Sequence, residues 1–287
     1  MRLKLPQLNN PQVIFLVLIA VVSLAFYNNR SVLFKNKQIG IPESVSTPTP
    51  TPTPSPRPLT FAEMSTLYGP CVSLPTLMYH HVQTKESAEA KKQTSLSVYT
   101  DIFKSQMQYL KDKGYNTLSM TDLVSFFDSG VAIPKHSVLI TFDDGYEDFY
   151  TDAFPILRDL GFKATVFTPT GLINNPDYLI WEQIASMNRS VLFANHTWSH
   201  KNVGVSESIM QYEISTADTQ LTERGLNSPK VFAYPYGFDS GQAQLYLSSL
   251  GYKAAFSTTP GNILCLKRRF DLPRVRIGNI PLSSYGF

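Results

Sequence analysis

Most of the chain lacks an excess of positive charge. The net charge of +3 comes from the first sixty residues, where six basic residues face a single acid, Glu43. Residues 61–287 are close to neutral and contain no broad cluster of Lys and Arg. A broad nucleic-acid-binding face needs such a cluster, so the sequence argues against that class of function.

The chain also lacks an apolar run of the usual membrane-spanning length. The uncharged run Val13–Tyr27 covers fifteen residues, whereas a spanning helix needs about 20. Arg2 and Lys4 precede this run, as in an export signal, and no small-x-small cleavage site follows it. We expect residues 1–40 to be a cytoplasmic tip and an uncleaved signal anchor, with a removed signal peptide as the alternative. Either way, the bulk of the chain leaves the cytoplasm.

Residues 41–60 are low in apolar mass and contain seven of the chain's 20 prolines. The stretch "TPTPTPTPSPRP" has few backbone donors, so it predicts an extended, solvated spacer of about 3.1 Å per residue. We interpret 41–60 as a Pro/Thr-rich linker that holds residues 61–287 away from the membrane. The alternative is a motif for a proline-binding partner.

Cysteine is scarce, with only Cys71 and Cys265 present. In an exported chain two cysteines indicate a disulfide, and these two lie near the ends of residues 61–287. Such a bond would close a long loop and contribute about 4–5 kcal/mol in the chain-entropy model. Two free thiols remain the alternative.

Apolar runs that read as strands alternate with helix-like segments in residues 61–287. The predicted strands are 75–82, 116–120, 137–142, 163–170, 190–195, 230–235, 252–258 and 272–278, and the predicted helices are 98–113, 146–160, 206–224 and 240–250. Continuous apolar strands separated by helices indicate a parallel sheet buried on both faces. The fold class is therefore α/β, a distorted or incomplete (β/α) barrel of about seven strands, in which chemistry gathers at the C-terminal ends of the strands.

Two adjacent carboxylates end one of these strands. In "VLITFDDGYED", Asp143 and Asp144 follow the apolar run and Gly145 allows a sharp turn. Neighbouring residues on a strand point to opposite faces, so both aspartates serve one site only if the strand ends here. A helix cap followed by a turn is the alternative.

Two histidines follow another predicted strand. In "NHTWSH", His196 and His200 are four residues apart, so one tight loop brings both imidazoles to the same side. Two imidazoles and one carboxylate would give the three protein ligands of an open divalent metal site, and a pair of surface histidines without that role is the alternative. If Asp144 ligates the cation, Asp143 can remain ionised as a base for water bound to the metal. A glycosidase is disfavoured, because its two carboxylates must lie about 5 to 9.5 Å apart across the scissile bond.

The segment "FAYPYG" ends a third strand with a turn fixed by Pro235 and Gly237. Backbone N–H groups of this turn can form an oxyanion hole. Tyr234 and Tyr236 can form a wall on which a sugar ring lies, with Trp198 as a further substrate-binding residue. A plain cluster of aromatic side chains at the strand end is the alternative.

These motifs resemble those of the polysaccharide deacetylases of carbohydrate esterase family 4, also called the NodB homology domain. "TFDDG" is similar to the first family motif, "HTWSH" to the second and "AYPYG" to the third. The resemblance extends from about Pro75 to the C-terminus. It implies metal-dependent N-deacetylation of a polymer containing N-acetylglucosamine, by attack of metal-bound water on the acetamide.

The resemblance also implies residue roles. Asp143 is the expected catalytic base, and the Tyr236 N–H is expected to stabilise the oxyanion. The expected ligands, usually to zinc, are Asp144, His196 and His200. The third motif's arginine is replaced by Ala233, and the family's C-terminal Leu-x-His motif is missing. We therefore hypothesise that Arg274, in "LPRVRIG", orients Asp143.

The segment "LMYHHV" resembles the subgroup that acts on poly-β-1,6-N-acetylglucosamine, in which a histidine of the first strand is the general acid. His80 follows Tyr79 directly and matches that histidine, whereas His81 should point the other way. We expect an exported, membrane-anchored enzyme. The alternatives are secretion and a catalytically impaired carbohydrate-binding protein on the same barrel.

Overall fold

The computed structural model describes residues 57–287, which form one compact unit from Arg57 to Phe287. The predicted membrane segment and most of the predicted linker lie outside the described residues. Within Arg57–Phe287, no helix is both long enough and apolar enough to cross a membrane.

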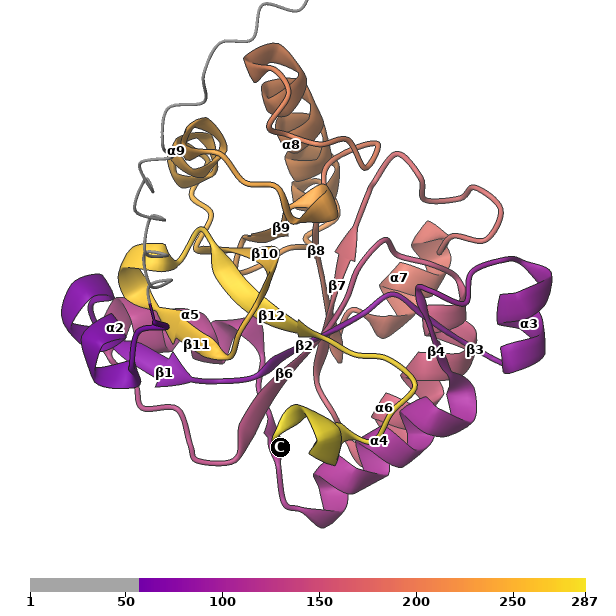
Figure 1. Ribbon diagram of the computed structural model, residues 1–287. Helices are drawn as coiled ribbons and strands as arrows, with labels where there is room; N and C mark the ends of the chain where they lie inside the picture. Colours follow the sequence, from indigo (N-terminus) through magenta and orange to yellow (C-terminus); the bar gives the residue numbers. More distant parts are fainter. Residues whose placement is uncertain (1–56) are drawn as a thin grey trace, which may run out of the picture. The chain divides into compact units, whose positions relative to one another are not determined.

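Seven parallel strands close into a barrel (Figure 1). In the order in which they pair, they are β2 (Thr76–Tyr79), β12 (Leu272–Arg276), β10 (Ala254–Pro260), β9 (Val231–Ala233), β8 (Val191–Asn195), β7 (Ala164–Thr168) and β6 (Ser137–Phe142). Strand β6 pairs back onto β2, with Tyr79 opposite Phe142. The prediction of about seven strands is confirmed, and the ring is closed rather than incomplete. The short β5 (Asn116–Thr117) pairs with β6 outside the ring.

The side chains of β6 alternate between two apolar layers. Val138, Ile140 and Phe142 belong to a core cluster that includes residues of the surrounding helices. Leu139 belongs to a second cluster, formed largely by strand residues such as Phe167. Because all six residues of β6 are buried, the strand reads as a continuous apolar run in the sequence.

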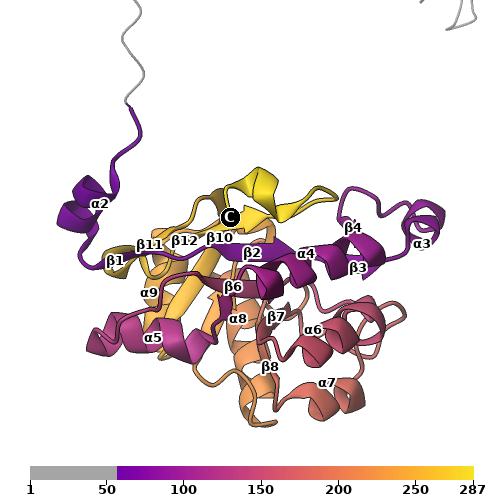
Figure 2. The same ribbon diagram turned by 90° about the horizontal axis from the view of Figure 1, so that it is seen from below.

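Helices lie around the outside of the strands (Figures 1 and 2). They are α4 (Thr100–Asp112), α5 (Met120–Ser129), α6 (Phe154–Leu160), α7 (Trp181–Met187), α8 (Glu207–Thr222) and α9 (Gly241–Ser249). The predicted helices 98–113, 206–224 and 240–250 are confirmed to within three residues at each end. The predicted helix 146–160 starts as a π-helical turn at Phe149–Ala153 and continues as α6.

The predicted strand 75–82 is not one strand. It leaves the barrel at His80, and the following residues form β3 (His81–Gln83), which pairs with β4 (Ser97–Tyr99) instead of a barrel strand. The nearby α3 (Lys85–Ala90) lies on the opposite side of the domain from α2 (Phe61–Tyr68) in both views (Figures 1 and 2).

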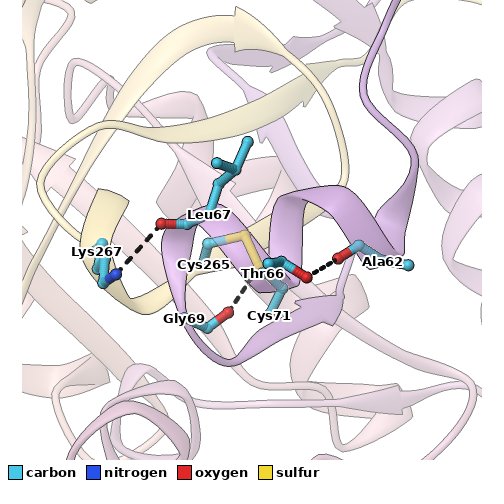
Figure 3. The surroundings of a disulfide bond; sticks show 7 residues. All are labelled: Ala62, Thr66, Leu67, Gly69, Cys71, Cys265 and Lys267. Carbon is cyan, nitrogen blue, oxygen red and sulfur yellow. Dashed lines mark hydrogen bonds between the residues drawn. A yellow bond between two sulfur atoms is a disulfide. The ribbon is translucent and has the colours of Figure 1, made fainter.

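A disulfide joins Cys71 to Cys265 (Figure 3). The two cysteines are opposite each other in the antiparallel pair of β1 (Cys71–Ser73) and β11 (Ile263–Cys265). Nearby, Lys267 Nζ donates to the carbonyl of Leu67 at the end of α2, at 3.3 Å. The predicted disulfide is confirmed, and it ties the start of the described domain to the segment before β12.

Candidate active site

The candidate site lies at the C-terminal ends of the barrel strands, where Asp143 and Asp144 follow β6. Alternate residues along a strand point to the same face, so residues 139, 141 and 143 share one face. Asp143 therefore points into the barrel, as Thr141 does. Asp144 has a φ of 72° and Gly145 a φ of 67°, so the chain turns sharply after Asp143. This turn lets two adjacent carboxylates face one site. A side chain at Gly145 would also meet Thr168, whose Cγ2 lies 3.1 Å from the ideal Cβ position.

Asp143 forms a two-pronged ion pair with Arg274. The two guanidinium nitrogens Nη1 and Nη2 donate to Oδ1 and Oδ2 of Asp143 at 2.7 and 2.6 Å. Arg274 lies on β12, is 0% exposed, and also donates from Nε to the Ser257 carbonyl at 3.0 Å. A bidentate pair of this kind fixes both the charge and the orientation of the carboxylate. The structure thus places Arg274 where the sequence hypothesis requires it.

Asp144, His196 and His200 converge from two separate loops. Oδ1 of Asp144 lies 3.4 Å from Nε2 of His196 and 3.0 Å from Nε2 of His200. One ligand atom from each residue lies within 4.8 Å of the other two. Asp144 Oδ1 is buried and has no hydrogen-bond partner among the described residues. A divalent cation would satisfy this oxygen and both nitrogens, so the residues fit a metal.

The outer contacts of His196 fix which ring nitrogen faces the cation position. Its Nδ1 lies 2.7 Å from the carbonyl oxygen of Ala233, so Nδ1 carries the proton and donates it there. In the neutral ring, Nε2 then presents its lone pair toward Asp144. Ala233 therefore contributes its backbone to the site, although its side chain replaces the arginine of the family motif.

The electrostatics of the site keep both aspartates ionised. Burial raises the pKa of Asp143, but the charge and hydrogen bonds of Arg274 outweigh this effect and leave the pKa below its usual value. Burial likewise raises the pKa of Asp144, but hydrogen bonds from the facing imidazoles, when their Nε2 atoms carry protons, outweigh it and hold the pKa well below its usual value. Burial lowers the pKa of His200, yet Asp144 outweighs it, so the His200 pKa is raised.

His80 and His81 point into different surroundings, as the strand alternation predicts. Burial lowers the pKa of His80, and the charges of Asp143 and Asp144 oppose this without cancelling it, so the charges of both aspartates reach His80. His81 is 2% exposed, and its Nδ1 lies 2.6 Å from Oδ2 of Asp148. Of the two histidines, His80 is therefore the one whose pKa the charges of Asp143 and Asp144 affect, and its catalytic role stays a prediction.

The predicted aromatic wall is only partly formed. Tyr236 is 61% exposed, and its ring centroid lies 4.8 Å from that of His200, so it borders the site. The prediction for Tyr234 is wrong. Tyr234 is 0% exposed in the core, where its hydroxyl donates to the Phe270 carbonyl at 2.9 Å, so it cannot contact a sugar. Trp198 is partly buried against the edge of Tyr212.

Sequence reasoning missed Glu213, a buried acid on α8. Its Oε2 accepts from the Ser199 N–H at 2.7 Å, and its Oε1 accepts from the Ser199 hydroxyl at 2.6 Å. Glu213 thereby holds the residue that precedes His200. A charged residue on the buried face of the predicted helix 206–224 was the available signal, since an acid is rarely buried without partners.

The chain is similar to known proteins in sequence and in fold. Residues 130–255 match the family model described as polysaccharide deacetylase. A poly-beta-1,6-N-acetyl-D-glucosamine N-deacetylase of Escherichia coli (strain K12) is 29% identical over 71% of this chain, and the match spans 36% of that protein. The protein of the same name from Staphylococcus aureus (strain N315) is 26% identical over 67% of this chain and 71% of its own length.

Among solved structures, the Streptococcus pyogenes deacetylase PplD in complex with acetate is similar, with a TM-score of 0.69 and 29% identity. The similarity covers 75% of this chain and 96% of that one. The range matched by the family model includes Asp143, Asp144, His196 and His200, whereas His80 and Arg274 lie outside it.

Proposed function

Because this chain carries a polysaccharide deacetylase domain, we propose that it removes N-acetyl groups from a polymer that contains N-acetylglucosamine. One observation carries the proposal. The three potential metal ligands converge beside Asp143, a carboxylate kept ionised and immobile by Arg274. A protein that only binds carbohydrate has no need of that arrangement.

The residues of the chain divide the hydrolysis among them. Asp144, His196 and His200 would hold a divalent cation, which would supply a Lewis acid for the acetamide carbonyl, and two imidazoles with one carboxylate suit Zn²⁺. Asp143 takes a proton from the attacking water. Arg274 keeps the carboxylate ionised, and each carboxylate oxygen keeps a lone pair that Arg274 does not use. The Tyr236 backbone N–H stabilises the oxyanion.

Cleavage of the C–N bond releases acetate and leaves an amine on the sugar. The departing nitrogen needs a proton, and His80 donates it. Tyr236 and Trp198 form the surface against which the sugar ring lies.

Poly-β-1,6-N-acetylglucosamine is the proposed polymer. The relatives from Escherichia coli and Staphylococcus aureus carry that substrate in their names. The segment that contains His80 resembles the subgroup that acts on the same polymer. Peptidoglycan glycan and chitin-like oligomers carry the same acetamide, so they form the comparison arms of the test.

We place the enzyme outside the cytoplasm, held to the membrane by its N-terminal segment. The Cys71–Cys265 disulfide supports export, since such bonds persist in oxidising compartments. The run Val13–Tyr27 and the proline-rich linker support a tethered catalytic domain.

Acetate release from the three polymers by the purified full chain tests the proposal. We expect release from poly-β-1,6-N-acetylglucosamine, its loss after treatment with a chelator, and its return when Zn²⁺ is added. The variant Asp143→Asn should lower kcat about 10²–10⁴-fold and retain one equivalent of metal, because it removes only the base. Bound metal without release from any polymer would instead support a carbohydrate-binding protein.

A further inference from the structure

A hollow of about 270 Å³, lined in part by His81, lies near the candidate active site. The ring of His81 stacks on Tyr146 with centroids 3.6 Å apart, and Tyr146 follows Asp144 by two residues. Asp148, which lines the hollow, follows Asp144 by four residues, so their Cα atoms are at most about 14 Å apart. A polymer can therefore reach both places at once.

The floor of the hollow is polar, and one of its polar side chains has a ring nitrogen without a hydrogen-bond partner among the described residues. His81 is 2% exposed and lines the hollow, and its Nε2 is buried without a hydrogen-bond partner among the described residues. Asp148 Oδ2 lies 2.6 Å from His81 Nδ1, and Asp148 Oδ1 accepts from the Val82 N–H at 3.2 Å. Buried polar atoms normally have partners, so the unpaired Nε2 of a histidine that lines the hollow leaves one hydrogen-bonding group of the described residues unused at this place.

The walls carry more negative than positive charge. Four carboxylates line the hollow, at Glu147, Asp148, Asp152 and Asp177. The ammonium of Lys91 is committed to Asp177, at 2.6 Å. In residues 57–287, Glu147 and Asp152 form no salt bridge and accept only from neutral donors. The hollow should therefore attract a cation.

The spacing of these carboxylates favours an organic cation over a metal ion. Within Arg57–Phe287, Asp144, His196 and His200 form the one group of acids and histidines whose ligand atoms all lie within 4.8 Å of one another. Metal ions need several oxygens at about 2.0–2.6 Å, which the more widely spaced acids of the hollow do not offer. A glucosamine unit can instead place its ammonium group on one carboxylate and its hydroxyl groups on the others.

We propose that this hollow binds a glucosamine unit, through its ammonium group, on the same polymer chain that occupies the active site. The inference rests on the proposed function, because deacetylation produces that amine. The enzyme would then recognise sugars that have already been deacetylated, and would bind a partly deacetylated chain more tightly than a fully acetylated one.

Binding of defined oligomers to the full chain carrying Asp143→Asn tests this site without turnover. We expect β-1,6-linked glucosamine oligomers to bind about tenfold more tightly than their N-acetylated counterparts in isothermal titration, with an affinity that falls as salt rises. Adding Glu147→Gln and Asp177→Asn should remove this preference. Both side chains are exposed, and Asn tolerates the positive φ of residue 177, so the fold should persist.

The matched control removes two exposed acids at a distance from the hollow, Asp159→Asn and Glu223→Gln, and should leave the preference unchanged. Equal affinity for both oligomers, or the same loss in the control, would overturn the proposal. Binding of Ca²⁺ alone in competition with glucosamine would show a metal site instead. A preference that depends on Glu147 and Asp177, in a protein whose wild type releases no acetate, would retain the hollow and reject the proposed function.

In the active wild type, the same site predicts a difference in KM. A partly deacetylated polymer should show a lower KM than a fully acetylated one, and the variant with Glu147→Gln and Asp177→Asn should lose that difference. Identical KM values for both polymers in the wild type would contradict recognition of the product.

Discussion

At the scale of single residues, the adjacent aspartates are stable together because each has its own cationic environment. Asp143 is paired with Arg274, and Asp144 faces two imidazoles where a metal fits. Without such partners, two neighbouring carboxylates would raise each other's pKa. One of them would then be protonated and could no longer accept a proton. The division of partners therefore explains how both side chains stay ionised in a buried site.

The variant Arg274→Lys tests whether the orientation of Asp143 matters beyond its charge. Lysine keeps the positive charge but cannot donate two parallel hydrogen bonds, so we expect kcat to fall about 10²-fold with metal content unchanged. Steady-state kinetics and metal analysis of the purified variant measure both. Arg276→Lys, on the same strand but exposed, is the matched control and should retain activity. Full activity of Arg274→Lys would reduce Arg274 to a structural role.

At the scale of elements, helix α8 supports the loop that carries the two histidines. Glu213 is 0% exposed and binds both the N–H and the hydroxyl of Ser199. Thr197 and His200 have positive φ angles of 69° and 60°, which non-glycine residues adopt only when their surroundings hold them. The buried carboxylate supplies part of that constraint from outside the site.

Replacing Glu213 with Gln should loosen this loop and weaken metal binding. The amide oxygen can accept from the Ser199 N–H, but the Ser199 hydroxyl then meets an NH2 group instead of a carboxylate oxygen, so both contacts lose their charge-assisted strength. We expect metal affinity to fall about tenfold, measured by competition with a chromogenic chelator, because outer contacts commonly contribute 10–100-fold. Glu207→Gln, an exposed acid on the same helix, is the control. Unchanged affinity in Glu213→Gln would mean that the loop holds its shape without the carboxylate.

The elements that were predicted are those whose signal is local. Strand β6 was predicted with the observed bounds because all its residues are buried, and α4 was predicted because Phe103, Met107 and Leu110 lie on one buried face. Helix α5 was missed, although Ser119 and Asp122 form a capping box and Gly130 ends it. Helix α3 has a single buried residue, Ala88, and so offers no apolar period to read.

The predictability of the site follows the same rule. The two aspartates and two histidines lie in short motifs, so their convergence could be predicted from strand ends. Arg274 is 131 residues away from Asp143 and could be proposed only because a family motif lacked its arginine. The burial of Tyr234 depends on packing against a distant segment at Phe270, which the sequence around Tyr234 does not reveal.

At the scale of the whole molecule, the barrel is closed by segments from both ends of the described domain. Strand β2 pairs with β12 on one side and with β6 on the other, so an early strand and the last strand are neighbours. The disulfide reinforces the same closure just outside the ring, through β1 and β11. The cysteine pair therefore restrains two segments of the fold that lie 194 residues apart along the chain.

Removing the disulfide should lower the stability of the whole domain more than its activity. The bond closes a loop with a sequence separation of 194 residues, so Cys71→Ala with Cys265→Ala should cost about 2–5 kcal/mol. For a domain of this size that corresponds to a fall in Tm of roughly 5–15 °C. Differential scanning calorimetry with and without reductant measures it.

A reductant should lower the Tm of the wild type toward that of the double variant and leave the variant unchanged. Acetate release below both Tm values should stay similar, because Asp143 and the three metal ligands are positioned by other strands. Equal Tm values for the two proteins under oxidising conditions would show that packing of β1 on β11 restrains these segments without the covalent bond.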